Sequence, residues 1–305
     1  MKLKIAIVTP ASIIKPELVD GACATLRAWG CEPQEGEHVR GEHGSFGGSY
    51  EERLSDLRDA MADPEVDAIL CSRGGYGCAH LLDALDADEA LWRYPKPVIG
   101  FSDVSALHAL WRKHGLSSVH SSMAKHLANF GPGDPINRRL LSILQGEGCQ
   151  AVEWMLPDAP FAPGRETLPM HADGEAAAPI VGGNLAVTQA LIGTPYDPFV
   201  PGAIILVEDI AEPIYKVERI FRQLCMAGIL RRAAGLIVGR FTEYRPSRDH
   251  ESMERMLSQF VGDLPQGAPV AFGAPVGHFD GNLPLLLNTP AHFTVADGRA
   301  RIEWP

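Results

Sequence analysis

The stretch PVIGFSDVSALHALW, residues 97–111, combines a strand, a turn and a helix within a short piece of chain. Its first four residues form an apolar run that is typical of a short buried strand. Residues 101–103 are typical of a turn, and residues 104–111 carry apolar side chains at helical spacing. A serine at such a turn is lifted clear of the backbone, and the N–H groups of the next helix point toward it. The stretch therefore predicts an α/β fold with Ser102 as a candidate nucleophile for acyl transfer.

Ser102 also has a simpler interpretation. The usual hydrolase turn is G-x-S-x-G, whereas the last position of this turn is Val104. Serine and aspartate are both favoured at helix N-caps, so Ser102 or Asp103 could serve only to begin the helix. The stretch alone leaves the nucleophile and the helix cap as alternatives.

A glycine-rich turn follows another apolar run. The run at 66–70 leads into Cys71-Ser72-Arg73-Gly74-Gly75-Tyr76-Gly77, ahead of a helical pattern at 79–85. Glycine allows positive φ and a close approach of backbone to a ligand. In a parallel sheet such turns gather at the carboxyl ends of the strands, where ligands bind. The spacing matches neither the phosphate-binding P-loop nor the full dinucleotide-binding pattern.

Strand-like and helical segments alternate along the first part of the chain, with strands near 4–8, 66–71 and 97–101 and helices near 16–29, 50–62, 78–85 and 103–114. This alternation predicts a doubly wound parallel sheet with helices on both faces. Farther along, helices are expected near 184–192, 217–225 and 251–261, and strands near 203–207, 235–238, 268–276, 292–296 and 300–304.

Proline, glycine and acidic residues are concentrated between about 131 and 175, including Pro157, Pro160, Pro163 and Pro169. We therefore expect an N-terminal α/β domain at 1–135, a linker at 136–175 and a smaller mixed α/β domain with a smaller sheet at 176–305. We expect the active site in the cleft between these two domains, which is a common place for a pocket.

Six short motifs together resemble the LD-carboxypeptidase family of serine peptidases. They are R-G-G-Y-G at 73–77, I-G-F-S-D at 99–103, G-G-N-L at 182–185, L-V-E-D at 206–209, E-P-I-Y at 212–215 and P-V-G-H at 275–278. The resemblance implies a triad with Ser102 as nucleophile, Glu208 as acid and His278 as base. It also implies an oxyanion hole formed by the backbone N–H groups of Gly75 and Asp103. One departure is His120-Ser121-Ser122, where the family usually shows H-G-P.

The residues themselves leave rivals for two of these roles. Histidine has a suitable pKa for a general base, and a carboxylate on its other ring nitrogen fixes the tautomer. His278 follows Gly277 at the end of a strand-like run, but His120 also follows an apolar segment. Glu208 ends the apolar run at 203–207, with Asp209 and Glu212 as rival carboxylates.

Composition limits the function classes. The chain has 305 residues, 46% hydrophobic and 21% charged, with a formal net charge of −11. These values indicate a soluble globular protein and argue against nucleic-acid binding, which needs clustered lysine and arginine. The six cysteines show no zinc-ligand spacing, and we expect free thiols, no metal and no cofactor. The start of the chain shows no signal peptide, and no apolar run reaches membrane-spanning length, so we expect a cytoplasmic protein without membrane partners. A homodimer is left open.

Three functions are compatible with these features. The first is removal of the terminal D-Ala from murein tetrapeptides in cell-wall recycling, with a muropeptide or other small peptide as substrate. The second is hydrolysis of a microcin-type peptide–nucleotide antibiotic by a peptidase of the same family. The third is non-catalytic binding of a small ligand in the glycine-rich cleft. Ser102, Glu208 and His278 are all present, which favours an enzyme.

Overall fold

The chain forms two compact units, each with its own sheet. The structure is a computed structural model that describes residues 2–147, 149, 151–158 and 169–305. Unit 1 consists of Met1–Cys149 and Asn282–Asn288, and unit 2 consists of Gln150–Gly281 and Thr289–Pro305. Unit 1 thus extends beyond the expected boundary at 135. It also includes Asn282–Asn288, which we expected in the second domain.

Unit 1 contains a six-stranded sheet with the order β11-β5-β4-β3-β1-β2. Its strands are β1 (Lys4–Val8), β2 (Glu32–Glu35), β3 (Ala68–Cys71), β4 (Val98–Gly100), β5 (Ser118–His120) and β11 (Leu285–Leu287). All neighbours pair in parallel except β11, which is antiparallel to β5. The order 2-1-3-4-5 is a doubly wound arrangement, and ligands bind beside its switch point at the carboxyl ends of β1 and β3. This confirms the fold class expected for the first domain.

Helices cover both faces of this sheet. Side chains of α1 (Pro16–Ala28), α5 (Ala124–Phe130) and α6 (Pro135–Leu144) pack with Ile5 and Ile7 in one hydrophobic core. The helix α2 (Tyr50–Ala62) lies against the opposite face, next to Ala6 and Val8. The remaining helical elements are η1 (Cys78–Leu81), α3 (Leu82–Asp86), η2 (Glu89–Arg93), η3 (Ser102–Val104) and α4 (Ser105–Lys113).

Unit 2 contains a mixed seven-stranded sheet with the order β10-β9-β8-β7-β12-β13-β6. Its strands are β6 (Val152–Met155), β7 (Gly174–Asn184), β8 (Ile204–Ile210), β9 (Gly235–Thr242), β10 (Val270–Gly277), β12 (Pro290–Ala296) and β13 (Arg299–Glu303). The four strands from β7 to β10 are parallel, whereas β12, β13 and β6 extend the sheet through antiparallel pairs. The class expected for the second domain is confirmed, but its sheet is not smaller than that of unit 1.

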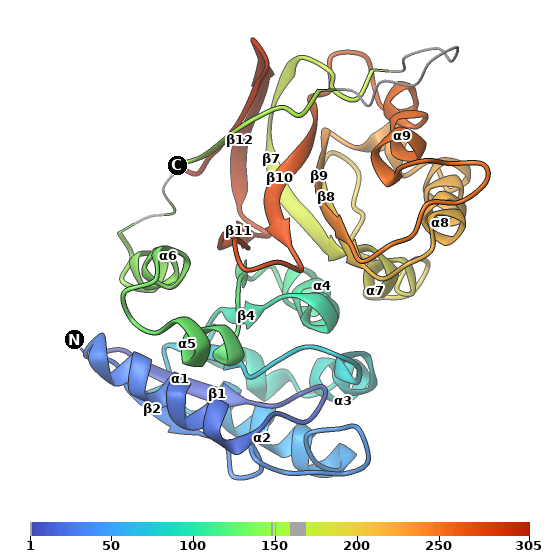
Figure 1. The fold of residues 1–305 in the computed structure, drawn as a ribbon. Coiled ribbons are helices and arrows are strands. Elements are labelled where there is room, and N and C mark those ends of the chain that lie inside the picture. Colours follow the sequence, from blue (N-terminus) through green and yellow to red (C-terminus); the bar gives the residue numbers. More distant parts are fainter. Residues whose placement is uncertain (1, 148, 150, 159–168) are drawn as a thin grey trace. The chain divides into compact units, whose positions relative to one another are not determined.

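One face of the parallel strands is covered by helices. The helices of unit 2 are α7 (Leu185–Gln189), α8 (Ile214–Met226), η4 (Leu230–Arg232), α9 (Met253–Ser258) and η5 (Val261–Asp263). Figure 1 shows α8 and α9 lying side by side, and Phe221 of α8 packs with Phe260 just after α9, with ring centroids 5.2 Å apart. These side chains form one hydrophobic core with Val207 and Val238 of β8 and β9.

The region expected as a linker holds regular structure. Helix α6 begins at a proline, and the side chain of Asp134 caps it by accepting from the N–H of Asn137. Strand β6 alternates buried and exposed residues, as expected for a sheet with one solvated face. Strand β7 starts inside the same region. Residues 148, 150 and 159–168 of the expected linker, with Pro160 and Pro163, lie outside the described residues.

Candidate active site

Ser102 lies at a sharp turn between β4 and the helical turn η3. Its φ is +64°, in the left-handed region that non-glycine residues adopt rarely. Such strained serines occur at the nucleophile turn of α/β hydrolases, where the conformation exposes the hydroxyl. The N-cap of α4 is Val104, with no side-chain cap. Neither Ser102 nor Asp103 therefore occupies the cap position that the simpler interpretation required.

The valine in place of the usual glycine is accommodated by Gly100. A Cβ on Gly100 would lie 2.9 Å from both methyl carbons of Val104. Only glycine at 100 therefore leaves room for a branched side chain at 104.

The glycine-rich turn after β3 packs directly against Ser102. A Cβ on Gly74 would lie 2.8 Å from Ser102 Cβ, 3.0 Å from its Oγ and 3.4 Å from the backbone nitrogen of Asp103. The next residue, Gly75, has φ +114°, a conformation that L side chains rarely adopt. The structure therefore brings Ser102, Gly75 and Asp103, three of the sequence-predicted site residues, into one region of unit 1.

Several side chains hold this turn in place. Asp103 Oδ2 accepts a hydrogen bond of 2.8 Å from the N–H of Cys78. The buried guanidinium of Arg53 donates to the carbonyls of Pro10, at 2.7 Å, and Gly77, at 3.1 Å. Ser12 Oγ accepts from the N–H of Tyr76 at 3.3 Å. These bonds join the loops after β1 and β3 at the switch point of the sheet.

Sequence reasoning missed Arg53 and Ser12. Ser12 carries a signal, because it follows the first strand of a doubly wound fold. Arg53 carries none, since its spacing is that of an ordinary residue in an amphipathic helix. Burial lowers the pKa of Arg53, which is 3% exposed.

Glu208 and His278 form a hydrogen-bonded pair in unit 2. His278 Nδ1 lies 2.7 Å from Glu208 Oε2, and the Glu208 side chain is fully buried while that of His278 is 12% exposed. His278 Nδ1 carries the proton in this pair, because an ionised carboxylate only accepts. With Nδ1 bonded to Glu208, any proton exchange between His278 and a substrate would use the other ring nitrogen, Nε2.

Irregular strands place this pair. Val207 pairs with Val238 and Asp209 with Phe241, so β9 carries one extra residue opposite Glu208, and such bulges re-aim side chains. A Cβ on Gly239 would come within 3.1 Å of Glu208 Cβ. A Cβ on Gly277 would lie 3.2 Å from Glu208 Oε2 and 2.9 Å from the carbonyl oxygen of Arg240. Both glycines therefore make room for the carboxylate.

The charges around His278 favour its protonated form. Burial lowers the pKa of His278, but the hydrogen bond and charge of Glu208 outweigh it, helped by Asp209 and Glu243, so the pKa is raised above its usual 6.5. A buried carboxylate is costly without a partner, and here it favours the imidazolium form of His278.

The rival carboxylates are engaged elsewhere. Asp209 accepts hydrogen bonds from the Asn184 side chain and the N–H of Ala186, both at 2.9 Å, and thereby holds the start of α7. Burial is the main cause that raises the pKa of Asp209, to about 6. Glu212 forms a 3.4 Å ion pair with Lys216 on the next turn. Of the three carboxylates, Glu208 is the one that contacts His278 in this way.

The rival base His120 is a core residue of unit 1. It ends β5, is fully buried, and its ring lies 5.8 Å from that of Phe101. Ser121 and Ser122, which replace the usual G-P, are also buried. The backbone N–H of Ser121 donates to the carbonyl of Gly100 at 3.0 Å, a bond that the glycine of the family pattern would also make.

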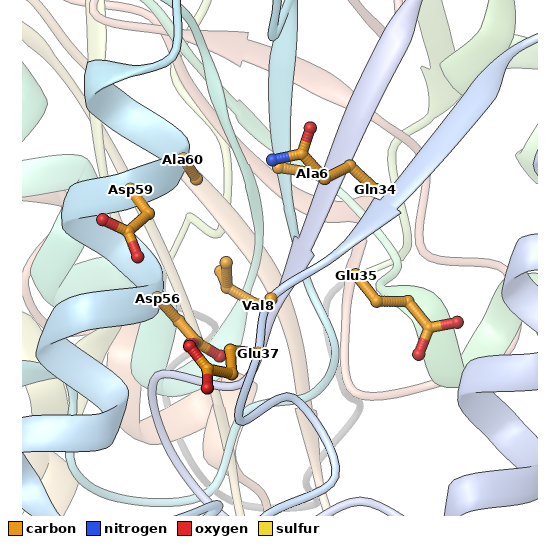
Figure 2. A pocket seen from close by; sticks show the side chains of 9 residues that line it. Ala6, Val8, Gln34, Glu35, Glu37, Asp56, Asp59 and Ala60 are labelled. Carbon is orange, nitrogen blue, oxygen red and sulfur yellow. The ribbon is translucent and has the colours of Figure 1, made fainter.

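A separate cavity in unit 1 lies between α2 and the strands β1 and β2 (Figure 2). Its volume is about 110 Å³, and its lining includes the carboxylates of Glu35, Glu37, Asp56 and Asp59. Asp56 is already bonded to the backbone N–H and the ring of His38. Four carboxylates would repel the carboxylate groups of a peptide substrate, and we assign this cavity no role.

Other sequence expectations concern cysteines, metals and membranes. All six cysteines are free thiols, and burial raises the pKa of Cys71 and Cys78 beside the glycine turn, which disfavours reactive thiolates there. Within the described ranges no group of three or more His, Cys, Asp or Glu side chains is arranged to hold a metal ion. None of the helices in that part of the chain combines the length and apolar character needed to cross a membrane.

Family models identify the class of protein. The model of the LD-carboxypeptidase N-terminal domain matches residues 5–121, and that of the C-terminal domain matches residues 177–293. The chain belongs to the LD-carboxypeptidase family, and it is a serine-type carboxypeptidase.

Individual relatives agree with this class. The chain is 30% identical over 279 residues to the murein tetrapeptide carboxypeptidase of Pseudomonas aeruginosa, covering 90% of this chain and 88% of the relative. The crystal structure of a muramoyltetrapeptide carboxypeptidase from Oxalobacter formigenes matches with a TM-score of 0.85 and 28% identity, over 99% of both chains. A microcin self-immunity protein in its apo state matches with a TM-score of 0.79 and 19% identity, over 99% of this chain and 96% of that one. The last match shows a shared fold alone.

Proposed function

We propose that this chain removes the terminal D-alanine from murein tetrapeptides by hydrolysing the amide bond between an L-centre and D-Ala. Ser102 is the nucleophile, His278 the general base and Glu208 the carboxylate that orients His278. The observation that carries the proposal is the strained Ser102 turn packed against Gly74. The hydrogen-bonded pair of Glu208 and His278 supports it independently from the other unit.

Each residue has a defined part in the reaction. The hydroxyl of Ser102 attacks the scissile carbonyl while His278 Nε2 takes its proton. The N–H groups of Gly75 and Asp103 donate to the oxyanion that forms. The imidazolium then gives its proton to the leaving amine of D-Ala, and a water molecule, activated by the same histidine, releases the acyl group from Ser102. Glu208 stabilises the charge that His278 carries between these steps.

The named relatives favour murein peptides as substrates. Relatives near 30% identity and with nearly full coverage carry murein carboxypeptidase names, whereas the microcin self-immunity protein shares only the fold. We therefore propose a muropeptide substrate and do not adopt the antibiotic-cleaving alternative. A cytoplasmic role in cell-wall recycling is part of this proposal. Six free thiols are typical of a reducing compartment, and fractionation of the producing cells would test the location.

The proposal is tested with Ser102→Ala, and the exposed Ser45→Ala serves as control. We expect Ser102→Ala to keep its circular dichroism spectrum and lose several orders of magnitude in turnover, as removal of a triad member does. Ser45→Ala should keep wild-type turnover. Release of D-Ala from a defined tetrapeptide, followed by mass spectrometry, gives the rates. A folded Ser102→Ala protein with near-normal release would exclude Ser102 as the nucleophile.

A second test concerns the distance between His278 and Ser102 during the reaction. A phosphonate bound covalently to Ser102 should be captured in a crystal with His278 Nε2 about 3 Å from the Ser102 oxygen, because proton transfer needs that distance. A complex in which His278 faces away from Ser102, in a reacted and fully inhibited enzyme, would make His120 the leading base. The triad proposed here would then be withdrawn.

A further inference from the structure

Arg240 lies next to Gly277 in the sheet, close to the Glu208–His278 pair, and among the described residues it forms no ion pair with a carboxylate. Arg240 is exposed and pairs with Gly277 between β9 and β10. Gly277 immediately precedes His278 in the chain. A Cβ on Gly277 would lie 3.3 Å from Arg240 Cβ and 3.2 Å from Glu208 Oε2. The Arg240 side chain therefore leaves the backbone on the same side of the sheet as the Glu208 carboxylate.

Within the part of the chain that the structure describes, the guanidinium contacts an aromatic ring rather than a carboxylate. Its carbon lies 5.2 Å from the centre of the Phe279 ring, in a cation–π contact. Stacking on a ring leaves the N–H groups at the edge of the guanidinium free to bind a carboxylate.

Charge around His278 calls for a cation. Glu208, Asp209 and Glu243 all raise the pKa of His278, so the field there is negative. A carboxypeptidase acts on a peptide with a free terminal carboxylate, which this field would repel. Lys216, a further cation of unit 2, is already paired with Glu212.

The chemistry of the leaving group places its carboxylate near His278. In the proposed reaction His278 Nε2 gives its proton to the amine of the leaving residue. The α-carboxylate of that residue is attached to the carbon next to the amine, so it lies about 4 to 5 Å from the proton donor. A residue that binds this carboxylate must therefore extend from a position close to His278, as Arg240 does.

We infer that Arg240 binds the α-carboxylate of the departing D-amino acid and so makes the enzyme a carboxypeptidase rather than an endopeptidase. This inference rests on the proposed function. It names the chemical group that the site selects, an anionic chain terminus next to the scissile bond. Charge-assisted hydrogen bonds of this kind contribute roughly ten- to a hundredfold to binding of the transition state.

The test crosses enzyme variants with two substrates. One is a murein-type tetrapeptide with a free terminal carboxylate, and the other is the same peptide with a terminal amide. Wild type should cleave the acid at least about tenfold better in kcat/KM. Arg240→Met should lose roughly ten- to a hundredfold on the acid and stay within about twofold on the amide, and Arg240→Lys should lie between. Arg245→Met, at an exposed arginine after β9, is the matched control and should keep the wild-type ratio.

The outcomes separate this inference from the proposed function. An Arg240→Met enzyme that loses activity equally on both peptides would show a structural role and overturn the inference. A wild type that cleaves acid and amide equally would also overturn it while leaving the peptidase activity intact. A wild type that cleaves neither peptide would refute the proposed function itself, and the inference with it. Cleavage of the amide by each variant reports that its catalytic machinery is folded.

Discussion

Replacing Gly74 by alanine adds one methyl group at the contact between the glycine-rich turn and Ser102. The new Cβ would lie 2.8 Å from Ser102 Cβ and 3.0 Å from its Oγ. Ordinary contacts of a Cβ begin at 3.4 Å, so the two segments must separate by about 0.6 Å. Gly74 does not adopt a positive φ, so backbone strain does not contribute to the effect.

The expected loss follows from that displacement. A misplacement of about 1 Å at reacting groups can cost about a hundredfold in rate. A shift of about 0.6 Å should therefore lower kcat by roughly ten- to a hundredfold, or about 1.4 to 2.7 kcal/mol in activation free energy. Overpacking should also lower the free energy of unfolding by about 1 to 3 kcal/mol.

Gly133→Ala is the matched control, because a Cβ at Gly133 meets nothing within 4 Å. Release of D-Ala from a tetrapeptide gives kcat and KM for both variants, and thermal unfolding by circular dichroism gives their stability. A Gly74→Ala protein that is folded and turns over like Gly133→Ala would refute the reasoning. It would mean that the turn does not pack on Ser102 in the working enzyme.

Three further predictions concern His278, its carboxylate partner and metals. The kcat/KM of the wild type should rise with pH around a midpoint above 6.5, because His278 must be neutral to act as a base and its pKa is raised. Glu208→Gln should move this midpoint to lower pH. A midpoint that stays in place or rises in the variant would contradict the pairing of Glu208 with His278. At its own pH optimum, Glu208→Gln should still lose about a hundredfold or more in kcat with little change in KM. Glu212→Gln and Asp209→Asn should lose less. A larger loss of kcat in either of these two variants would mean that Glu208 is wrongly assigned as the acid. Dialysis against EDTA should leave kcat unchanged, and activity lost with EDTA and restored by zinc would overturn the serine mechanism.

Much of unit 1 could be predicted from the sequence, because its segments are locally consistent. The apolar run before Ser102 and the helical pattern after it agree with β4 and α4. The glycines at 74 and 75 mark a close approach, and the structure shows what they approach. Strand β2 was not predicted, since Glu32–Glu35 is a short polar edge strand without an apolar run.

Unit 2 was harder to predict, because several of its strands owe their pairing to distant partners. Strand β7 contains three alanines and a proline, which have low strand propensity, yet it pairs with β8 on one side and β12 on the other. Strand β11 is only three residues long, and it pairs with β5 of unit 1 across a long sequence separation. Local patterns cannot report such pairings, since propensity is a weak guide where tertiary contacts decide.

The candidate site shows the same division between residue identity and geometry. Sequence motifs could identify Glu208 and His278 as candidates. They could not explain why the buried carboxylate of Glu208 lies within hydrogen-bond distance of the imidazole. The extra residue in β9 opposite Glu208 and the absence of side chains at Gly239 and Gly277 allow that contact, and both depend on the pairing of β8, β9 and β10. Since Glu208 and His278 pair within one unit, the imidazole is oriented before any substrate arrives. In the proposed mechanism the further alignment required is that of His278 with Ser102, and we propose that binding energy from the substrate is used for catalysis at this step.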